Sequence, residues 1–325
     1  LTHTKEAFEM VRELDPGSVL PDIYMRFIWA LEGDLESLED YFEPDDGSPT
    51  PTAYRAVMAF MRDDPELQAA LGDSLEPGYV LLSQALVLNV PDNYANGLRF
   101  LESIGSLMEG ESALGWVAET QAHAEAAMGR WEDARARFGT MPDNMHPWRL
   151  TYESILTAMP FTRATPAEIR ALRRKVVNWR PLANFAIDED DYGLVGQRYA
   201  PDFALHPHLK EFSLAMLDIR LGETDRAEAA LRRMEALPVP PENEPIVSEL
   251  LITVRGWMVY ERGDYEGVLA ILADARQHAL YNMLYSGQQD RPTQRYLRAL
   301  TLEKVGRLEE AVPWFRYIGE KTERS

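Results

Sequence analysis

Four glycines anchor a repeated pattern of small and apolar residues, and this pattern limits the possible folds more than any other feature of the chain. The matching stretches are AAMGRWEDARARF around Gly129, IRLGETDRAEAAL around Gly222, YERGDYEGVLAIL around Gly263 and EKVGRLEEAVPWF around Gly306. Small residues stand seven positions before these glycines, at Ala122, Ala215, Gly256 and Ala299, and five positions after them, at Ala134, Ala227, Val268 and Ala311. Nine residues after each glycine stands an apolar residue: Phe138, Leu231, Leu272 and Phe315. Twelve residues after each glycine stands another: Met141, Met234, Ala275 and Ile318. Such self-similarity predicts a repeated structural unit.

The pattern is typical of two antiparallel helices joined by a tight turn. Paired helices approach closely only where a small side chain on one faces a small side chain on the other. The glycine ends the first helix, because it adopts a left-handed backbone conformation without steric cost. A single hairpin cannot bury its apolar faces alone, so neighbouring hairpins must stack. We therefore expect an all-α chain of stacked antiparallel helical hairpins.

This small–glycine–small–aromatic spacing resembles the tetratricopeptide repeat (TPR) over about residues 111–142 and 205–320. The resemblance implies an α-solenoid superhelix. The last three glycines are 41 and 43 residues apart, whereas the family repeat is about 34 residues long. Longer helices or linkers, such as LPVPPENEP at 237–245, must absorb the difference. In its acidic composition and loose repeats the chain also looks like TPR regions of bacterial multidomain regulators.

The N-terminal part carries weaker repeats. Gly33 resembles a fifth anchor, but Arg26 stands where a small residue is expected. Apolar periodicity predicts further helices at 52–62, 76–88 and 93–106. We therefore expect residues 1–110 to form a divergent helical-hairpin region with irregular repeats. Residues 111–325 should form the TPR-like array, interrupted by an acidic loop at about 185–203.

A further helical pair is predicted between residues 148 and 180. Its second helix should start at Thr165, where T-P-A-E offers a capping threonine, a first-turn proline and a glutamate three residues on. That helix carries a basic cluster of Arg170, Arg173, Arg174 and Lys175 opposite the apolar stripe Ile169, Leu172, Val176 and Trp179. In an acidic chain, such a cluster favours pairing with acidic neighbours inside the array over contact with a partner. The sequence has no sustained run of alternating apolar and polar residues, so we predict no β-sheet.

Charge and composition narrow the function classes. The chain has 33 basic and 53 acidic side chains, a formal net charge of −20, which disfavours nucleic acids and anionic lipid surfaces and favours a cationic partner. It has no cysteine, which excludes disulfides, thiolate catalysis and sulfur-ligated zinc. No run approaches the roughly 20 apolar residues of a membrane helix. The chain begins at Leu1, so we interpret it as a mature or excised segment. We expect a cytoplasmic location, with secretion as the alternative that a processed N-terminus leaves open.

Candidate metal and catalytic motifs are weak. The acidic run 188–191 fails the calcium-loop pattern, because Tyr192 and Tyr199 take its fifth and twelfth places. His206 and His208 flank Pro207 without further ligands at metal-binding spacing, which favours a polar turn before a helix. No phosphate-binding glycine loop, nucleophile elbow or kinase signature is present. The sequence therefore nominates no catalytic residue, metal or cofactor.

In TPR arrays the first helix of each hairpin lines a groove that takes a peptide. Carried over from the four matches, the groove-facing positions are Trp116, Glu119, His123, Phe212, Met216, Arg220, Trp257, Tyr260, Tyr296 and Lys304. This set is rich in aromatic residues, which are typical interface anchors, although the same positions can also pack between hairpins as core. Only Arg220 and Lys304 fall on positions that family members use to clamp a C-terminal carboxylate, which disfavours that activity.

The sequence thus favours a non-enzymatic scaffold that binds a protein or peptide in the groove of a TPR-like superhelix. One alternative is an all-α enzyme or small-ligand protein with an acidic, Trp-lined, carbohydrate-like cavity. A second alternative is a structural subunit of a larger complex. The partner and the oligomeric state stay open.

Overall fold

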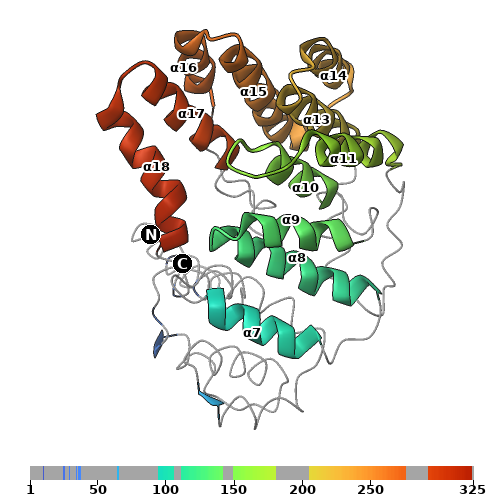
Figure 1. Ribbon diagram of the computed structural model, residues 1–325, viewed down its shortest axis with the longest axis vertical. Helices are drawn as coiled ribbons and strands as arrows, with labels where there is room; N and C mark the ends of the chain where they lie inside the picture. Colours follow the sequence, from blue (N-terminus) through green and yellow to red (C-terminus); the bar gives the residue numbers. More distant parts are fainter. Residues whose placement is uncertain are drawn as a thin grey trace. The chain divides into compact units, whose positions relative to one another are not determined.

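The computed structural model describes residues 94–105, 111–141, 149–180, 205–275, 292–323 and a few isolated positions before 94, and most of these residues are helical (Figure 1). These ranges hold eleven α-helices, one 3₁₀ helix and no strand. The α-helices are α7 (Tyr94–Gly105), α8 (Glu111–Ala127), α9 (Trp131–Thr140), α10 (Arg149–Ala158), α11 (Pro166–Asn178), α13 (His206–Arg220), α14 (Thr224–Ala236), α15 (Glu244–Glu261), α16 (Tyr265–Ala273), α17 (Pro292–Lys304) and α18 (Leu308–Glu323). The all-α prediction is confirmed for these ranges. The predicted anchor at Gly33, the helices at 52–62 and 76–88, and the acidic loop at 185–203 lie outside them.

The chain divides into two compact units, residues 1–128 with 321–325, and residues 129–320. This boundary differs from the one near residue 110 that repeat divergence predicts. In the first unit, α7 matches the helix predicted at 93–106 and packs against α8. Tyr94 and Leu98 of α7 meet Ala124 of α8, with Met128 partly buried beside them.

The four anchor glycines are the glycines with left-handed backbone among the described residues, with φ of 73° at Gly129, 71° at Gly222, 77° at Gly263 and 78° at Gly306. At three of these turns the amide after the glycine donates back to a carbonyl five residues earlier. The N–H of Glu223 bonds Asp218 O at 2.9 Å, that of Asp264 bonds Val259 O at 3.3 Å, and that of Arg307 bonds Leu302 O at 2.9 Å. This is the Schellman pattern of a glycine-terminated helix, and it confirms the predicted helix ends.

The small residues around each glycine form the helix–helix contacts. Ala215 and Ala299, seven positions before their glycines, are fully buried, as are Ala134, Ala227 and Val268 five positions after theirs. A methyl group added at Gly256 would lie 2.9 Å from Leu297 Cδ2 of α17, inside van der Waals contact. The repeat offsets are therefore the positions at which neighbouring helices approach most closely.

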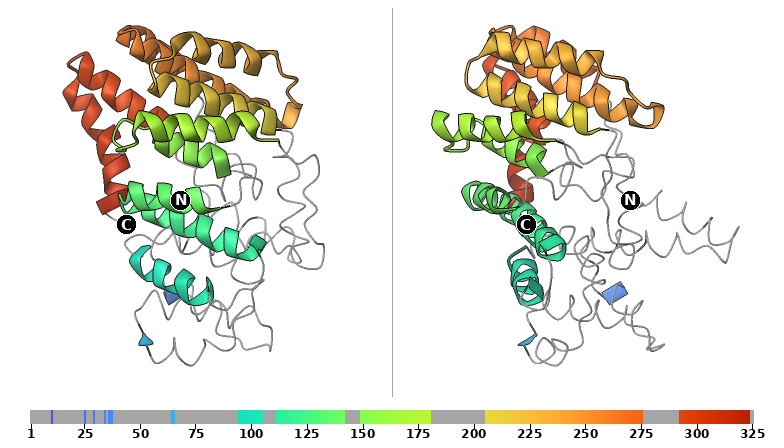
Figure 2. Two further views of the ribbon diagram at one scale, coloured as in Figure 1. Left: turned by 45° about the vertical axis from the view of Figure 1, so that its right-hand side comes forward. Right: turned by 90° about the vertical axis from the view of Figure 1, so that its right-hand side faces the viewer.

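Four helix pairs follow α9 in the described part of the second unit: α10–α11, α13–α14, α15–α16 and α17–α18. The first helices contact one another in order, α10 with α13, α13 with α15, and α15 with α17. Each second helix also contacts the next first helix, α11 with α13, α14 with α15, and α16 with α17. Figure 2 shows α13 to α16, in yellow and orange, layered on the light-green pair α10–α11. The last pair folds back as well, because the rings of Tyr296 and Phe315 lie 6.2 Å apart and Arg298 lies 5.0 Å from the Trp314 ring centre.

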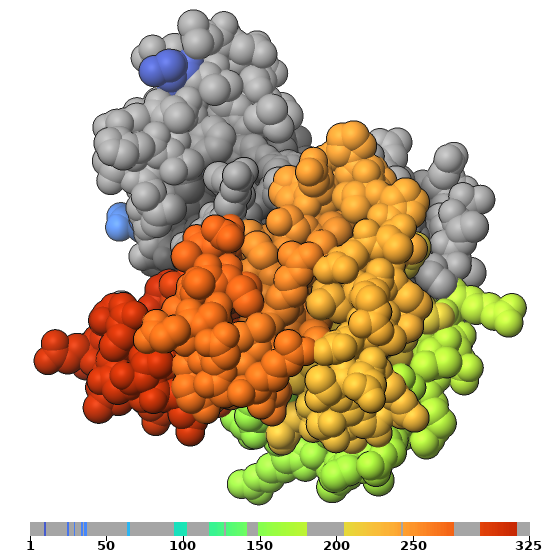
Figure 3. All heavy atoms as spheres, turned by 90° about the horizontal axis from the view of Figure 1, so that it is seen from above, coloured from blue at the N-terminus to red at the C-terminus, as the bar shows by residue number. Residues whose placement is uncertain are grey.

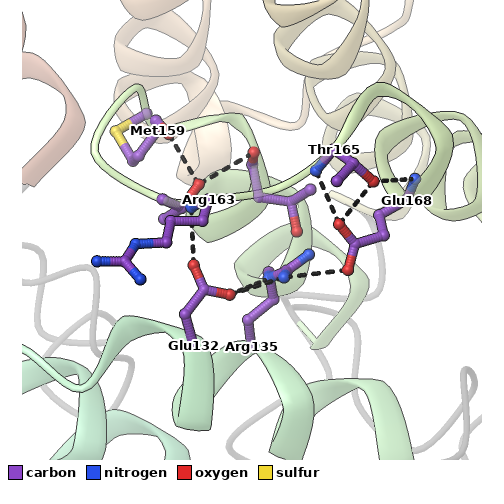
Figure 4. A network of polar contacts seen from close by, with 8 residues as sticks. Glu132, Arg135, Met159, Arg163, Thr165 and Glu168 are labelled. Carbon is purple, nitrogen blue, oxygen red and sulfur yellow. Dashed lines mark hydrogen bonds and ion pairs between the residues drawn. The ribbon is translucent and has the colours of Figure 1, made fainter.

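The predicted capping box at Thr165 is present and ties α9 to the next pair (Figure 4). Thr165 N–H donates to Glu168 Oε2 at 2.7 Å, and Glu168 N–H donates to Thr165 Oγ1 at 3.3 Å. Arg135 of α9 pairs with Glu168 at 3.2 Å, while Glu132 accepts the backbone N–H of Arg163 at 2.7 Å. A local helix-start motif therefore also anchors one helix pair to the helix before it.

Candidate functional site

Seven aromatic rings touch one another in sequence across the second unit, and we name them the aromatic row. They are Trp131 of α9, Phe161 of the α10–α11 turn, Tyr296 of α17, Trp257 and Tyr260 of α15, Tyr265 of α16 and Phe315 of α18. The consecutive centroid distances are 4.8 Å for Trp131–Phe161, 5.1 Å for Phe161–Tyr296, 6.5 Å for Tyr296–Trp257, 5.7 Å for Trp257–Tyr260 and 5.4 Å for Tyr260–Tyr265, with Phe315 branching from Tyr296. The row therefore connects the first and last helices of the unit.

Six of the seven rings are half-buried, and only Trp257 is buried. A core aromatic cluster would hide all its members, whereas these six keep part of each ring at the surface. Half-buried Tyr and Trp side chains supply large contact area at low entropic cost, which is why they dominate interface hot spots. The aromatic row is thus the described surface best suited to bind a partner.

Trp257 carries an unused hydrogen-bond donor inside the row. Its side chain is 3% exposed, and no acceptor among the described residues meets its indole N–H. A buried donor without an acceptor costs about 1–3 kcal/mol.

Acidic groups surround the two central tyrosines. Burial raises the phenol pKa of both Tyr260 and Tyr296, and the carboxylate of Glu303 raises both further. Glu261 adds to the negative potential at Tyr260, and desolvation raises the pKa of Glu261 itself. Arg220 opposes these effects at Tyr296 and Glu261. Both phenols therefore stay protonated at neutral pH. The net electrostatic potential that neighbouring side chains produce at them is negative.

The sequence identified Trp257, Tyr260 and Tyr296 of this row but missed the other four rings. Trp131 and Tyr265 both stand two positions after an anchor glycine, a signal that alignment of the repeats could have exposed. Phe161 follows α10 in a turn without an anchor glycine, so no repeat offset marks it. Its contact with Tyr296 joins residues far apart in the chain and becomes visible only in the fold.

Other predicted groove residues lie elsewhere. Phe212 and Met216 are each 2% exposed and Trp257 is 3% exposed, so all three are buried and the expectation that they face a groove is corrected. In the first unit, Glu119 is 5% exposed and lies 3.6 Å from His123. The side chain of Trp116 lies outside the described residues. Arg220 and Lys304 are exposed at the ends of α13 and α17.

Of the four residues in the basic cluster on α11, one pairs with a neighbouring helix and three are exposed. Arg173 makes an ion pair with Asp218 of α13, its Nη2 donating to Oδ2 at 2.9 Å. Arg170, Arg174 and Lys175 are exposed. The cluster thus supplies one ion pair inside the array and three cations at the surface.

The two neighbouring histidines are buried, which corrects the expected polar turn. His206 and His208 form the first turn of α13 and are 4% and 1% exposed. The ring of His206 lies 5.2 Å from that of Trp179, and burial lowers the pKa of His208. An apolar hollow of about 510 Å³ borders this turn, lined by Pro207, His208, Leu237, Pro238, Val239 and Pro240.

Neither a candidate metal-ion site nor a membrane-spanning helix is present in the ranges that the structure describes. No group of three or more His, Asp or Glu side chains there could hold a metal ion. No helix there combines the length and the apolar character needed to cross a membrane.

Comparison of the chain with family models, with curated proteins and with solved structures gives no match. Its function is therefore inferred from the residues themselves.

Proposed function

We propose that the chain is a non-enzymatic scaffold whose TPR-like helical hairpins bind an extended segment of another protein along the aromatic row. The four glycine-anchored turns and the ordered contacts between successive helix pairs support a superhelix of stacked hairpins. In such an array the first helices line one face. Two of them, α15 and α17, supply Trp257, Tyr260 and Tyr296 to the row.

The observation that carries the proposal is the series of touching rings, six of which are half-buried. Its rings come from α9, the α10–α11 turn, α15, α16, α17 and α18, so the line crosses several helix pairs. An extended peptide matches this shape, because alternate side chains can stack on successive rings.

Charge indicates the chemistry of the partner. The net charge of −20 attracts cationic segments over long range, and Glu261 and Glu303 bring negative potential to Tyr260 and Tyr296. Cationic side chains gain about 0.5–2 kcal/mol from lying over an aromatic face. We therefore expect a bound peptide to carry Lys or Arg.

The test is selection of binders from a random peptide library, followed by affinity measurement of the enriched peptides by fluorescence anisotropy. Tyr260→Ala combined with Tyr296→Ala should weaken their binding at least about tenfold. The matched control is Val177→Ala with Val239→Ala, which removes exposed apolar side chains away from the row and should leave affinity unchanged. Equal affinities of both double variants would refute the row as the binding site.

A carbohydrate ligand is the second candidate, because stacked rings beside the carboxylates of Glu261 and Glu303 also suit a sugar ring. Titration calorimetry with neutral oligosaccharides separates the two. Binding heat in the wild type that is lost in the Tyr260→Ala, Tyr296→Ala variant would favour the sugar. No binding heat with any oligosaccharide, together with peptide binding, would favour the scaffold.

A further inference from the structure

Two large apolar side chains on α18 are exposed. Leu308 is 59% exposed and Val312, one turn later, is 44% exposed. Both belong to the few large apolar side chains that are exposed among the described residues. In Figure 3 the red C-terminal segment lies at one edge of the face shown, next to the orange helices.

Comparison with the earlier second helices shows what this face is suited to contact. The residue six positions after an anchor glycine is Arg135 on α9, Glu228 on α14, Leu269 on α16 and Val312 on α18. Arg135 pairs with Glu168 at 3.2 Å, and Glu228 pairs with Arg262. In both cases the partner belongs to the following helix pair. Val312 holds the same position on α18, and its side chain is 44% exposed.

Two charged residues beside Val312 indicate which charges a surface that docks on α18 must carry. Glu309 and Arg316 stand seven residues apart, on the same side of the apolar positions 308 and 312. Both are exposed, and neither makes an ion pair with a described residue. By contrast, the adjacent Glu310 is paired with Arg307 at 2.6 Å. With 308 and 312 as core positions of a heptad, 309 and 316 both take its e position, and e positions of two antiparallel helices face each other.

We propose that a second copy of this chain docks on α18, with the two α18 helices antiparallel across a two-fold axis near Val312. Leu308 and Val312 of the two copies then form the apolar centre. Glu309 of each copy faces Arg316 of the other, which gives two equivalent ion pairs. Phe315 of the aromatic row also lies on α18, seven residues after Leu308. Glu309 and Arg316 do not belong to the row, so variants at these two positions test this contact separately from the peptide site.

The contact is small, because only about three helical turns from each copy take part. Interfaces below about 1,200 Å² are typical of weak, transient association. The net charge of −20 on each copy also opposes pairing, so physiological ionic strength is needed to screen long-range repulsion. We expect a dimer with a dissociation constant of about 10–500 µM.

Sedimentation velocity over a concentration series tests the proposal with four proteins. Glu309→Arg and Arg316→Glu should each weaken self-association about three- to tenfold, because each places like charges opposite one another twice. An equimolar mixture of these two variants should associate at least as tightly as the wild type, because the charges are then complementary again. Asp225→Arg is the control, since Asp225 holds on α14 the repeat position that Glu309 holds on α18.

Recovery in the mixture is the decisive result, because neither a folding defect nor a change in net charge produces it. A wild type that stays monomeric throughout the series contradicts the proposal. So does a dimer that responds equally to Asp225→Arg and Glu309→Arg. Circular dichroism of each variant should match the wild type, because all substituted side chains are exposed.

Discussion

Arg173 of α11 donates two hydrogen bonds to the carboxylate of Asp218 on α13. The Nη2–Oδ2 bond is 2.9 Å long, and the Asp218 side chain is 1% exposed. The pair lies between two successive helix pairs, where apolar contacts alone would allow the helices to slide. A buried carboxylate needs its cation, so the ion pair fixes the relative register of α11 and α13.

Arg173→Ala should therefore destabilise the protein by about 2–4 kcal/mol, because it leaves a buried charge unpaired. Urea unfolding measures the change. In a double-mutant cycle, Arg173→Ala with Asp218→Ala should cost less than the sum of the two single losses. Arg174→Ala, an exposed neighbour on the same helix, should change stability by less than about 0.5 kcal/mol. Additive losses would show that the pair contributes no coupling.

Gly256 marks the closest helix approach and should reject larger side chains. Its added methyl group would meet Leu297 at 2.9 Å, so Gly256→Val should cost about 1–3 kcal/mol despite the higher helix propensity of valine. Ala270→Val on α16 is the control, because Ala270 is exposed. Thermal unfolding of both variants provides the comparison, and equal midpoints would contradict close packing at Gly256.

Pro313 weakens α18 from within. It lies inside the helix, where a proline cannot donate to the carbonyl of Glu309. Pro313→Ala should stabilise the protein by about 1 kcal/mol or more, after allowance for the stiffer unfolded chain that proline gives. Pro245→Ala in the first turn of α15 should give no such gain, because amides there have no partner within the helix. A gain of the same size in both variants would show that the lost hydrogen bond is not the cause.

Glu168 should make stability depend on pH in the acidic range. Hydrogen bonds from the backbone and side chain of Thr165, together with the charge of Arg135, lower its pKa from 4.5 to about 2. A carboxyl with a lowered folded-state pKa stabilises above its unfolded pKa, and this contribution is lost as pH falls toward the folded value. The stability difference between wild type and Glu168→Gln should thus shrink between about pH 5 and pH 2. Urea unfolding at stepped pH measures it, and a constant difference would contradict this role.

The repeat offsets predicted the local structure well, because they record constraints that act within one hairpin. A left-handed turn at Gly222 and a small side chain at Ala227 are both required by two helices in close contact. The capping box at Thr165 likewise depends on residues only three positions apart. Such requirements are visible in a single sequence.

Burial was harder to predict, because it depends on how neighbouring pairs meet. Phe212 and Tyr296 come from equivalent first helices, yet Phe212 is core and Tyr296 is half-buried. Helix α13 is flanked by first helices on both sides, α10 and α15. The contact of Tyr296 with Phe161 arises from the path of the whole unit, which no local spacing encodes.

The central claim, that a peptide lies on the aromatic row, is tested most directly by fluorine NMR of protein labelled with fluorotyrosine. Tyr260→Phe and Tyr296→Phe assign the two signals among the 14 tyrosines of the chain. On titration with a selected peptide, both signals should shift with one saturation curve, whereas the buried Tyr152 of α10 should stay unchanged. Saturable binding that leaves the Tyr260 and Tyr296 signals in place would contradict the account.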